Sequence, residues 1–137
     1  MSHYFNPVEI IKTDDWLSVL QRRLVELNIS SPLIVTSQGN RERLNIDSLF
    51  DLESIFDDFG TNPKFDDCSK AIKFCRDKIF DGVLAIGGGS AMDMAKVIMA
   101  HLCLEITDIY DLISFKENYP KTIPSIFLPT THGTASE

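Results

Sequence analysis

Apolar residues recur at helical spacing in three stretches of the chain. The first, 16–28, follows two aspartates that can each cap a helix, and its one-sided apolar pattern predicts an amphipathic surface helix. The second, 65–79, predicts another amphipathic helix, with Ile79 on its apolar face. The third, 91–100, is apolar almost all round, which predicts a helix that is buried.

Short continuous apolar runs lie between these helices, as is typical of strands buried on both faces. The predicted strands are 33–36, 55–59, 83–86 and 125–128. Gln38-Gly39-Asn40 is interpreted as the turn that closes the first of them, 41–52 as a short helix, and 4–12 as an edge strand that could pair between subunits of a homodimer. Alternating strands and helices predict an α/β fold, a doubly wound, mostly parallel sheet with helices on both faces.

Composition limits the size and the partners of the protein. A chain of 137 residues has the length of one domain, for which roughly 100 to 200 residues are usual. Twenty acidic residues against thirteen Lys and Arg give a net charge of −7. Nucleic acids and anionic membrane surfaces are bound through Lys and Arg, so neither is expected as a partner. An anionic ligand would need local donors, such as backbone N–H groups.

Targeting signals are not apparent, and the cysteines are few. The first 15 residues lack a basic segment followed by an apolar one, and no apolar run approaches the roughly 18 residues of a membrane span. Three cysteines without a C-x-x-C pair fit a reducing cytoplasm. Cys68 and Cys75 would lie about 10 Å apart on one helix, too far for a disulfide, and are expected to be half-buried thiols without chemistry.

A glycine turn, Gly87-Gly88-Gly89-Ser90, joins a predicted buried strand to the predicted buried helix. Glycine lets the backbone approach a ligand closely, and a helix start offers unpaired N–H groups and the positive end of its dipole. In a doubly wound sheet, ligands bind outside the carboxyl ends of the strands. The turn therefore suits a phosphate, and Asp93 falls in the first turn of the predicted helix. The alternative is a plain strand-to-helix turn with Ser90 as N-cap.

A second polar loop, 129–137, follows the last predicted strand and would be ordinary if it stood alone. Together, GGGSAMDMAK and, about 40 residues later, PTTHGTASE resemble the iron-containing (group III) alcohol dehydrogenases. The cofactor domain of that family carries a GGGS-x-x-D-x-x-K turn and a P-T-T-x-G-T-x-S-E loop. The resemblance also covers the runs 33–36 and 82–86 and the Asn62-Pro63 turn, so it spans nearly the whole chain. It indicates the family and leaves the substrate open.

The resemblance implies that residues 1–137 form a Rossmann-like domain that binds NAD or NADP. By their match to the two motifs, the cofactor-binding residues would be Gly88, Gly89, Ser90, Asp93, Thr130, Thr131 and Thr134. Many family members have Asp at the place of Ser37, where it binds the adenosine ribose and repels a 2′-phosphate. Ser37 is therefore also a candidate contact, and cofactor preference stays open. His132 and Ala135 replace residues that are usually small or Gly, which could alter the fit of cofactor or substrate.

Enzymes of this family bind Fe²⁺ or Zn²⁺ through one Asp and three His of a helical second domain, and the metal polarises the alcohol or aldehyde oxygen. The resemblance implies that this domain is absent from the sequence, as if it were cut off before the metal ligands. His3, His101 and His132 lack the spacing of a metal site, so no metal ligand or catalytic residue is assigned. The acid pairs 57–58 and 66–67 are expected to be solvated.

The leading hypothesis is the cofactor-binding part of a metal-dependent alcohol dehydrogenase or aldehyde reductase, inactive by itself. The parent enzyme would transfer a hydride between NAD(P)(H) and a small alcohol or aldehyde. Glycerol dehydrogenases, glycerol-1-phosphate dehydrogenases and dehydroquinate synthases have a similar glycine turn and remain an alternative. A non-catalytic nucleotide-binding or interaction module is another. The substrate, the metal and the oligomeric state do not follow from the sequence.

Overall fold

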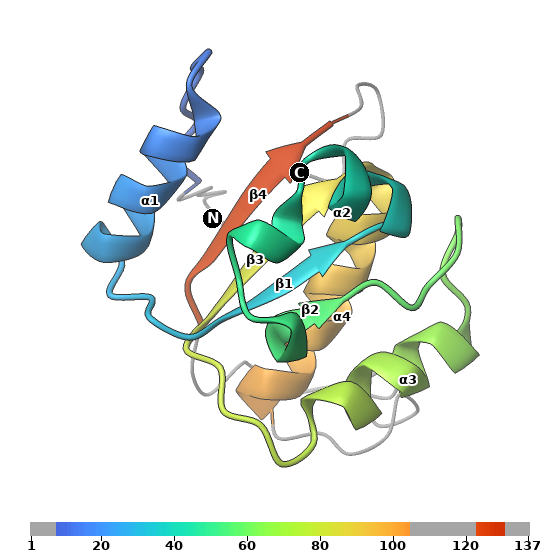
Figure 1. The fold of residues 1–137 in the computed structure, drawn as a ribbon. Coiled ribbons are helices and arrows are strands. Elements are labelled where there is room, and N and C mark those ends of the chain that lie inside the picture. Colours follow the sequence, from blue (N-terminus) through green and yellow to red (C-terminus); the bar gives the residue numbers. More distant parts are fainter. Residues whose placement is uncertain (1–7, 105–122, 131–137) are drawn as a thin grey trace, which may run out of the picture.

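The computed structural model describes residues 8–104 and 123–130, in which a parallel sheet carries helices on both faces, as the sequence predicts (Figure 1). The helices are α1 (Trp16–Glu26), α2 (Gln38–Arg43), α3 (Phe65–Cys75) and α4 (Gly89–Leu104). Two short 3₁₀ turns are η1 (Ile46–Ser48) and η2 (Leu52–Ser54). The strands are β1 (Pro32–Thr36), β2 (Ile55–Phe56), β3 (Gly82–Gly87) and β4 (Ser125–Pro129).

All three strand pairings are parallel, and the order across the sheet is β2-β1-β3-β4. The register sets Thr36 of β1 opposite Ile86 of β3, and Gly87 of β3 opposite Pro129 of β4. The carboxyl ends of β1, β3 and β4 therefore lie at one edge of the sheet. In this fold class, that edge is where ligands bind.

Successive strand residues point to opposite faces of the sheet, and the two faces have separate cores. Helices α3 and α4 cover one face, with α4 running behind the sheet in the view of Figure 1. The buried residues of α4 include Met92, Met94, Ala95 and Ile98, so the predicted buried helix is confirmed. Helix α1 and η1 cover the other face. The buried residues there are Leu20, Ile34, Ile46, Ile55, Leu84 and Ile86.

The amphipathic helix α1 also agrees with its sequence pattern. Asp15 caps it, accepting a hydrogen bond from the backbone N–H of Ser18 at 3.3 Å. Cys68 and Cys75 are free thiols on α3 and are more deeply buried than expected. Burial raises the pKa of Cys75 to about 11, so this thiol stays protonated at neutral pH. Within the described residues, no helix is long and apolar enough to cross a membrane.

Helix α3 is shorter than its apolar pattern predicts. It ends at Cys75, Arg76 is extended, and Asp77 has a left-handed backbone with φ of 64°. The chain therefore leaves the helix axis before Ile79, whose side chain is 90% exposed. The prediction that Ile79 lies on the buried face is wrong, because the pattern gives the spacing of apolar residues but not the position of the helix end.

Two predictions near the first strand need correction. Gln38-Gly39-Asn40 is not a closing turn but the first turn of α2, since Ser37 acts as its N-cap. The helix expected within 41–52 is thus displaced toward the N-terminus, and the 3₁₀ turns η1 and η2 fill the rest. Of the edge strand expected at 4–12, residues 8–12 are described and lie outside any strand.

Candidate functional site

The carboxyl ends of β3 and β4 are joined directly at the edge of the sheet. The backbone N–H of Thr130, just after β4, donates to the carbonyl oxygen of Gly87 at 2.8 Å. Gly87 is the last residue of β3 and is buried, whereas Thr130 is exposed. The glycine turn and the start of the second polar loop, two motifs far apart in sequence, are therefore neighbours in space.

Gly87 must be glycine in this arrangement. Its φ of 150° is rare for any residue with a side chain. A Cβ atom built on it would lie 3.0 Å from Cβ of Ala91 and 3.2 Å from Nδ2 of Asn40. The backbone of β3 thus passes directly into α4 with no room for a side chain at the junction.

Helix α4 begins at Gly89, two residues earlier than the sequence pattern suggested. The carbonyl of Gly88 accepts from the backbone N–H of Met92 at 3.1 Å. The N–H groups of Gly89 and Ser90 come before this bond, so the helix itself provides no acceptor for them. Gly88, Gly89 and Ser90 are all half-buried at the edge where the strands end. An anion placed there would meet backbone donors and the positive end of the dipole of α4.

Ser90 does not have the N-cap position of the alternative interpretation, and Asp93 lies outside the helical turn predicted for it. Ser90 is the second residue of α4 and not its N-cap, and its hydroxyl oxygen accepts a hydrogen bond from the backbone N–H of Asn62 at 3.2 Å. Asp93 is exposed and falls in the second turn of α4, beyond the first turn in which the dipole effect is strongest. The helix dipole is therefore a weaker explanation for Asp93 than the sequence suggested.

Ser37 lies at the end of β1 on the same edge. Its hydroxyl oxygen accepts from the backbone N–H of Asn40 at 3.2 Å, which caps α2. The side chain is half-buried and carries no charge, so it offers a hydroxyl where an acidic residue would repel a phosphate. Thr131 and Thr134, the remaining candidate contacts, lie outside the described residues, as do His132 and Ala135.

Asn40 is a site residue that the sequence did not reveal. Its Nδ2 donates to Oγ1 of Thr130 at 3.4 Å, a contact between residues 90 positions apart. Its Oδ1 accepts a hydrogen bond from Nη2 of Arg43. Asn40 therefore touches both predicted motifs, Gly87 in the first and Thr130 in the second. No local sequence signal indicates this, because the contact depends on how β1, β3 and β4 are ordered in the sheet.

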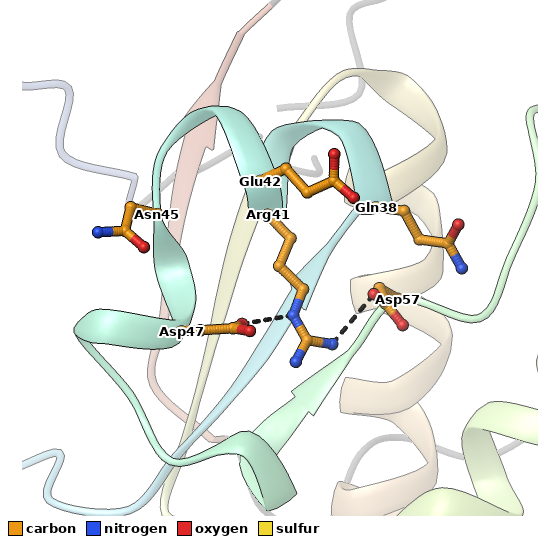
Figure 2. A pocket seen from close by; sticks show the side chains of 6 residues that line it. All are labelled: Gln38, Arg41, Glu42, Asn45, Asp47 and Asp57. Carbon is orange, nitrogen blue, oxygen red and sulfur yellow. Dashed lines mark hydrogen bonds and ion pairs between the residues drawn. The ribbon is translucent and has the colours of Figure 1, made fainter.

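A hollow of about 490 Å³ lies beside α2, lined by polar and charged side chains (Figure 2). Figure 2 shows Arg41 at its centre, with the guanidinium between the carboxylates of Asp47 and Asp57. Arg41 donates hydrogen bonds to both carboxylates. The bond to Asp47, and then the bond to Asp57, raises the pKa of Arg41 against the opposing effect of burial. Asp57 is thus ion-paired and not simply solvated as expected. With its charge balanced by two carboxylates, Arg41 connects α2 to the end of β2 and is a poor anion ligand.

A metal site cannot be built from the described residues. Across 8–104 and 123–130, no group of three or more His, Cys, Asp or Glu side chains could hold a metal ion. The buried thiols of α3 do not change this, since burial raises the pKa of both Cys68 and Cys75 and disfavours the thiolate that a metal needs. The residues that the structure describes therefore do not fit an iron or zinc centre.

The chain is similar to known proteins over most of its length. The family model described as iron-containing alcohol dehydrogenase matches residues 7–137. Long-chain-alcohol dehydrogenase 1 of Geobacillus thermodenitrificans is 36% identical over 85 residues, which is 61% of this chain and 22% of that protein. NADH-dependent butanol dehydrogenase B of Clostridium acetobutylicum is 33% identical over 142 residues, covering 98% of this chain and 36% of that protein.

A solved structure resembles the whole of this chain. Sulfoacetaldehyde reductase from Bifidobacterium kashiwanohense, in complex with NAD⁺, aligns with 100% of this chain at a TM-score of 0.82 and 28% sequence identity. The alignment covers 38% of that reductase. The chain thus spans little more than a third of the length of such relatives.

Proposed function

Because this chain belongs to the iron-containing alcohol dehydrogenase family, we propose that residues 1–137 form the NAD(P)-binding domain of a metal-dependent alcohol dehydrogenase or aldehyde reductase. In the parent reaction, a hydride passes between the nicotinamide ring and a carbon of a small alcohol or aldehyde. The domain supplies the surface on which the cofactor is held and oriented.

One observation carries the proposal: the glycine turn and Thr130 meet at the carboxyl edge of the sheet. The turn offers half-buried backbone N–H groups at Gly89 and Ser90, and Thr130 offers an exposed hydroxyl beside them. A cofactor diphosphate at the start of α4 would be neutralised by backbone donors, which an acidic protein can provide without Lys or Arg. Thr131 and Thr134 are proposed to extend the same contact surface.

Both nicotinamide cofactors are compatible with the end of β1. Ser37 is neutral, so it would not repel a 2′-phosphate, and its hydroxyl can donate to a ribose oxygen while it accepts from Asn40. The cationic Arg41 nearby is already paired with two carboxylates and would give a 2′-phosphate little additional attraction. We therefore propose that the domain accepts NAD(H) and NADP(H) without strong discrimination.

We assign cofactor binding to this chain, and we assign no chemical step to it. The described residues do not fit a metal site, and the chain covers only 38% of the reductase that it resembles. The groups that bind the metal and the alcohol are proposed to belong to the additional length of the parent enzyme. The 137-residue chain is expected to form no NAD(P)H from alcohols. Alcohol-dependent NADH formation by the purified chain would contradict this part of the proposal.

Cofactor binding can be tested by calorimetric titration of the 137-residue chain with NAD⁺, NADH, NADP⁺ and ADP. In a Ser90→Asp variant, the new carboxylate can still accept from the N–H of Asn62 and suits a helix start, so the fold should persist. It would repel the diphosphate, and we expect at least a roughly tenfold loss of affinity. Ser69→Asp, on the exposed side of α3, adds the same charge elsewhere and should leave affinity unchanged.

Two results would count against the proposal. One is that none of the four nucleotides binds to the unsubstituted chain. The other is unchanged affinity in Ser90→Asp with its fold intact by circular dichroism. An absence of binding together with a stable dimer in solution would favour the interaction module instead.

A further inference from the structure

We propose that Asn40 and Arg43 are positioning residues that orient the hydroxyl of Thr130 as a hydrogen-bond donor toward the cofactor. The proposal rests on the function proposed above, and it concerns residues outside both sequence motifs. Neither Asn40 nor Arg43 has to touch the cofactor for this effect.

The three side chains form a continuous series of contacts. Nη2 of Arg43 donates to Oδ1 of Asn40, and Nδ2 of Asn40 donates to Oγ1 of Thr130 at 3.4 Å. The backbone of Asn40 is held as well, since its N–H donates to the hydroxyl oxygen of Ser37, the N-cap of α2. Its carboxamide also lies against Gly87, where a Cβ atom would come within 3.2 Å of Nδ2. The side chain is thus fixed between two loops of the proposed cofactor site.

The direction of these hydrogen bonds follows from their chemistry. A guanidinium has donors only, so Arg43 must face the oxygen of the Asn40 carboxamide. The NH₂ group of Asn40 is then turned toward Thr130, and because it too can only donate, Oγ1 of Thr130 must accept. A threonine hydroxyl has a single proton, which is therefore left to point away from Asn40.

That remaining proton is available to a ligand. Thr130 is exposed, and its backbone N–H is already bonded to the carbonyl of Gly87, which fixes the residue beside the glycine turn. A ligand at this edge would thus meet a hydroxyl already set to donate. The ligand group that suits it is an acceptor oxygen, such as those of a diphosphate, a ribose or a carboxamide. The orientation is established before binding, so less rotational freedom is lost when the cofactor binds.

The test is an Asn40→Asp substitution in the 137-residue chain, titrated with NADH. A carboxylate still accepts from Arg43 but has no donor for Thr130, so the threonine proton turns toward residue 40 and away from the ligand. We expect a loss of NADH affinity of about tenfold. Asn45→Asp is the matched control, because Asn45 is exposed and lies just beyond α2, and it should change affinity less than about twofold.

A double-mutant cycle separates hydroxyl orientation from the effect of added charge. In a Thr130→Val background there is no hydroxyl to orient, so Asn40→Asp should lower affinity less than about twofold further. Thr130→Ser should restore the sensitivity to Asn40→Asp, since serine also has one hydroxyl proton. Arg43→Met allows the carboxamide to rotate and should cost about two- to threefold in affinity, again only when Thr130 is present. This milder variant serves if Asn40→Asp does not fold.

The outcomes separate this proposal from the proposed function. NADH binding by the unsubstituted chain with equal affinity in Asn40→Asp overturns the role of Asn40 alone. An equal loss with and without the Thr130 hydroxyl also overturns it, because the loss would then be a charge effect. Failure of the unsubstituted chain to bind NADH or any of the other three nucleotides overturns the proposed function, and this proposal with it.

Discussion

Asp81 joins two loops at the edge of the sheet opposite the glycine turn. Its carboxylate accepts three hydrogen bonds, from the backbone N–H of Ser30 at 2.8 Å, the hydroxyl of Ser30 at 2.9 Å and the backbone N–H of Ser31 at 2.8 Å. Its own N–H donates to the carbonyl of Ser31 at 3.1 Å. These bonds connect the loop before β1 to the loop before β3, about 50 residues later. We predict that Asp81→Asn destabilises the fold.

The magnitude follows from the number and type of these bonds. A hydrogen bond to a charged group contributes about 1.5 to 3 kcal/mol, and this carboxylate is only half-buried, so solvent screening reduces each contribution. An Asn side chain keeps one acceptor oxygen and loses the charge. We expect a loss of about 2 kcal/mol in the free energy of unfolding, which corresponds to a melting temperature lower by roughly 6–10 °C for a domain of this size.

The pH dependence of this loss of stability tests directly whether the ionised carboxylate of Asp81 is responsible for it. Burial alone would raise the pKa of Asp81, but the hydrogen bonds from Ser30 and Ser31 outweigh it and hold the pKa below its ordinary value. A carboxyl with a lower pKa in the folded state stabilises the fold above its unfolded pKa of about 3.9, and this stabilisation is lost as pH falls through the folded value. The difference between Asp81→Asn and the unsubstituted chain should therefore be full at pH 7 and shrink progressively below about pH 5.

Urea unfolding at pH 7, 5, 4 and 3 measures this difference. Asp14→Asn is the matched control, since Asp14 is exposed and the neighbouring Asp15 is the residue that caps α1. It should change stability by less than about 0.5 kcal/mol at every pH. A loss in Asp81→Asn that stays constant from pH 7 to pH 3 would refute the reasoning, because the stabilisation would then not depend on the ionised carboxylate.

Two further predictions concern β1 and β3. Thr36 is fully buried, and its hydroxyl has no hydrogen-bond partner among the described residues. Thr36→Val should therefore raise the free energy of unfolding by about 1 kcal/mol in the same urea assay. A destabilised variant would show that the hydroxyl does have a hydrogen-bond partner. A Cβ at Gly82 would lie 2.8 Å from the side chain of Ile29, so Gly82→Ala should lower the free energy of unfolding by about 1–3 kcal/mol. Ile29→Ala in the same chain should recover part of that loss, and purely additive losses would contradict the clash.

Much of the fold follows from the sequence because the sheet is parallel and covered on both faces. Its strands then appear as unbroken apolar runs, such as 83–86, and the helices between them keep a regular apolar period. The ends of helices are less predictable. The end of α3 depends on Asp77 adopting a left-handed backbone, and the start of α2 depends on Ser37 acting as a cap in a stretch that resembles a turn.

The candidate site, like the fold, could be predicted from the sequence only in part. The glycine turn could be located because three successive glycines after a buried strand are a local signal. The contact of Asn40 with Thr130 could not, because it arises from the parallel register that sets Gly87 opposite Pro129 and from the position of α2 over that edge. The ion pair of Asp57 with Arg41 likewise depends on β2 lying beside β1.

The contacts of Asp81 lie just before the first residue of β3, and the glycine turn begins at its last residue, Gly87. Six residues of extended chain, Gly82–Gly87, separate them by roughly 17–20 Å, with fully buried side chains between. Substitutions at that distance without shared partners usually have additive effects. For protein engineering, this means that the domain can be made more heat-resistant at the Ser30–Asp81 edge while the proposed cofactor site is varied at the other edge. The two properties can then be selected in separate libraries and combined in one chain.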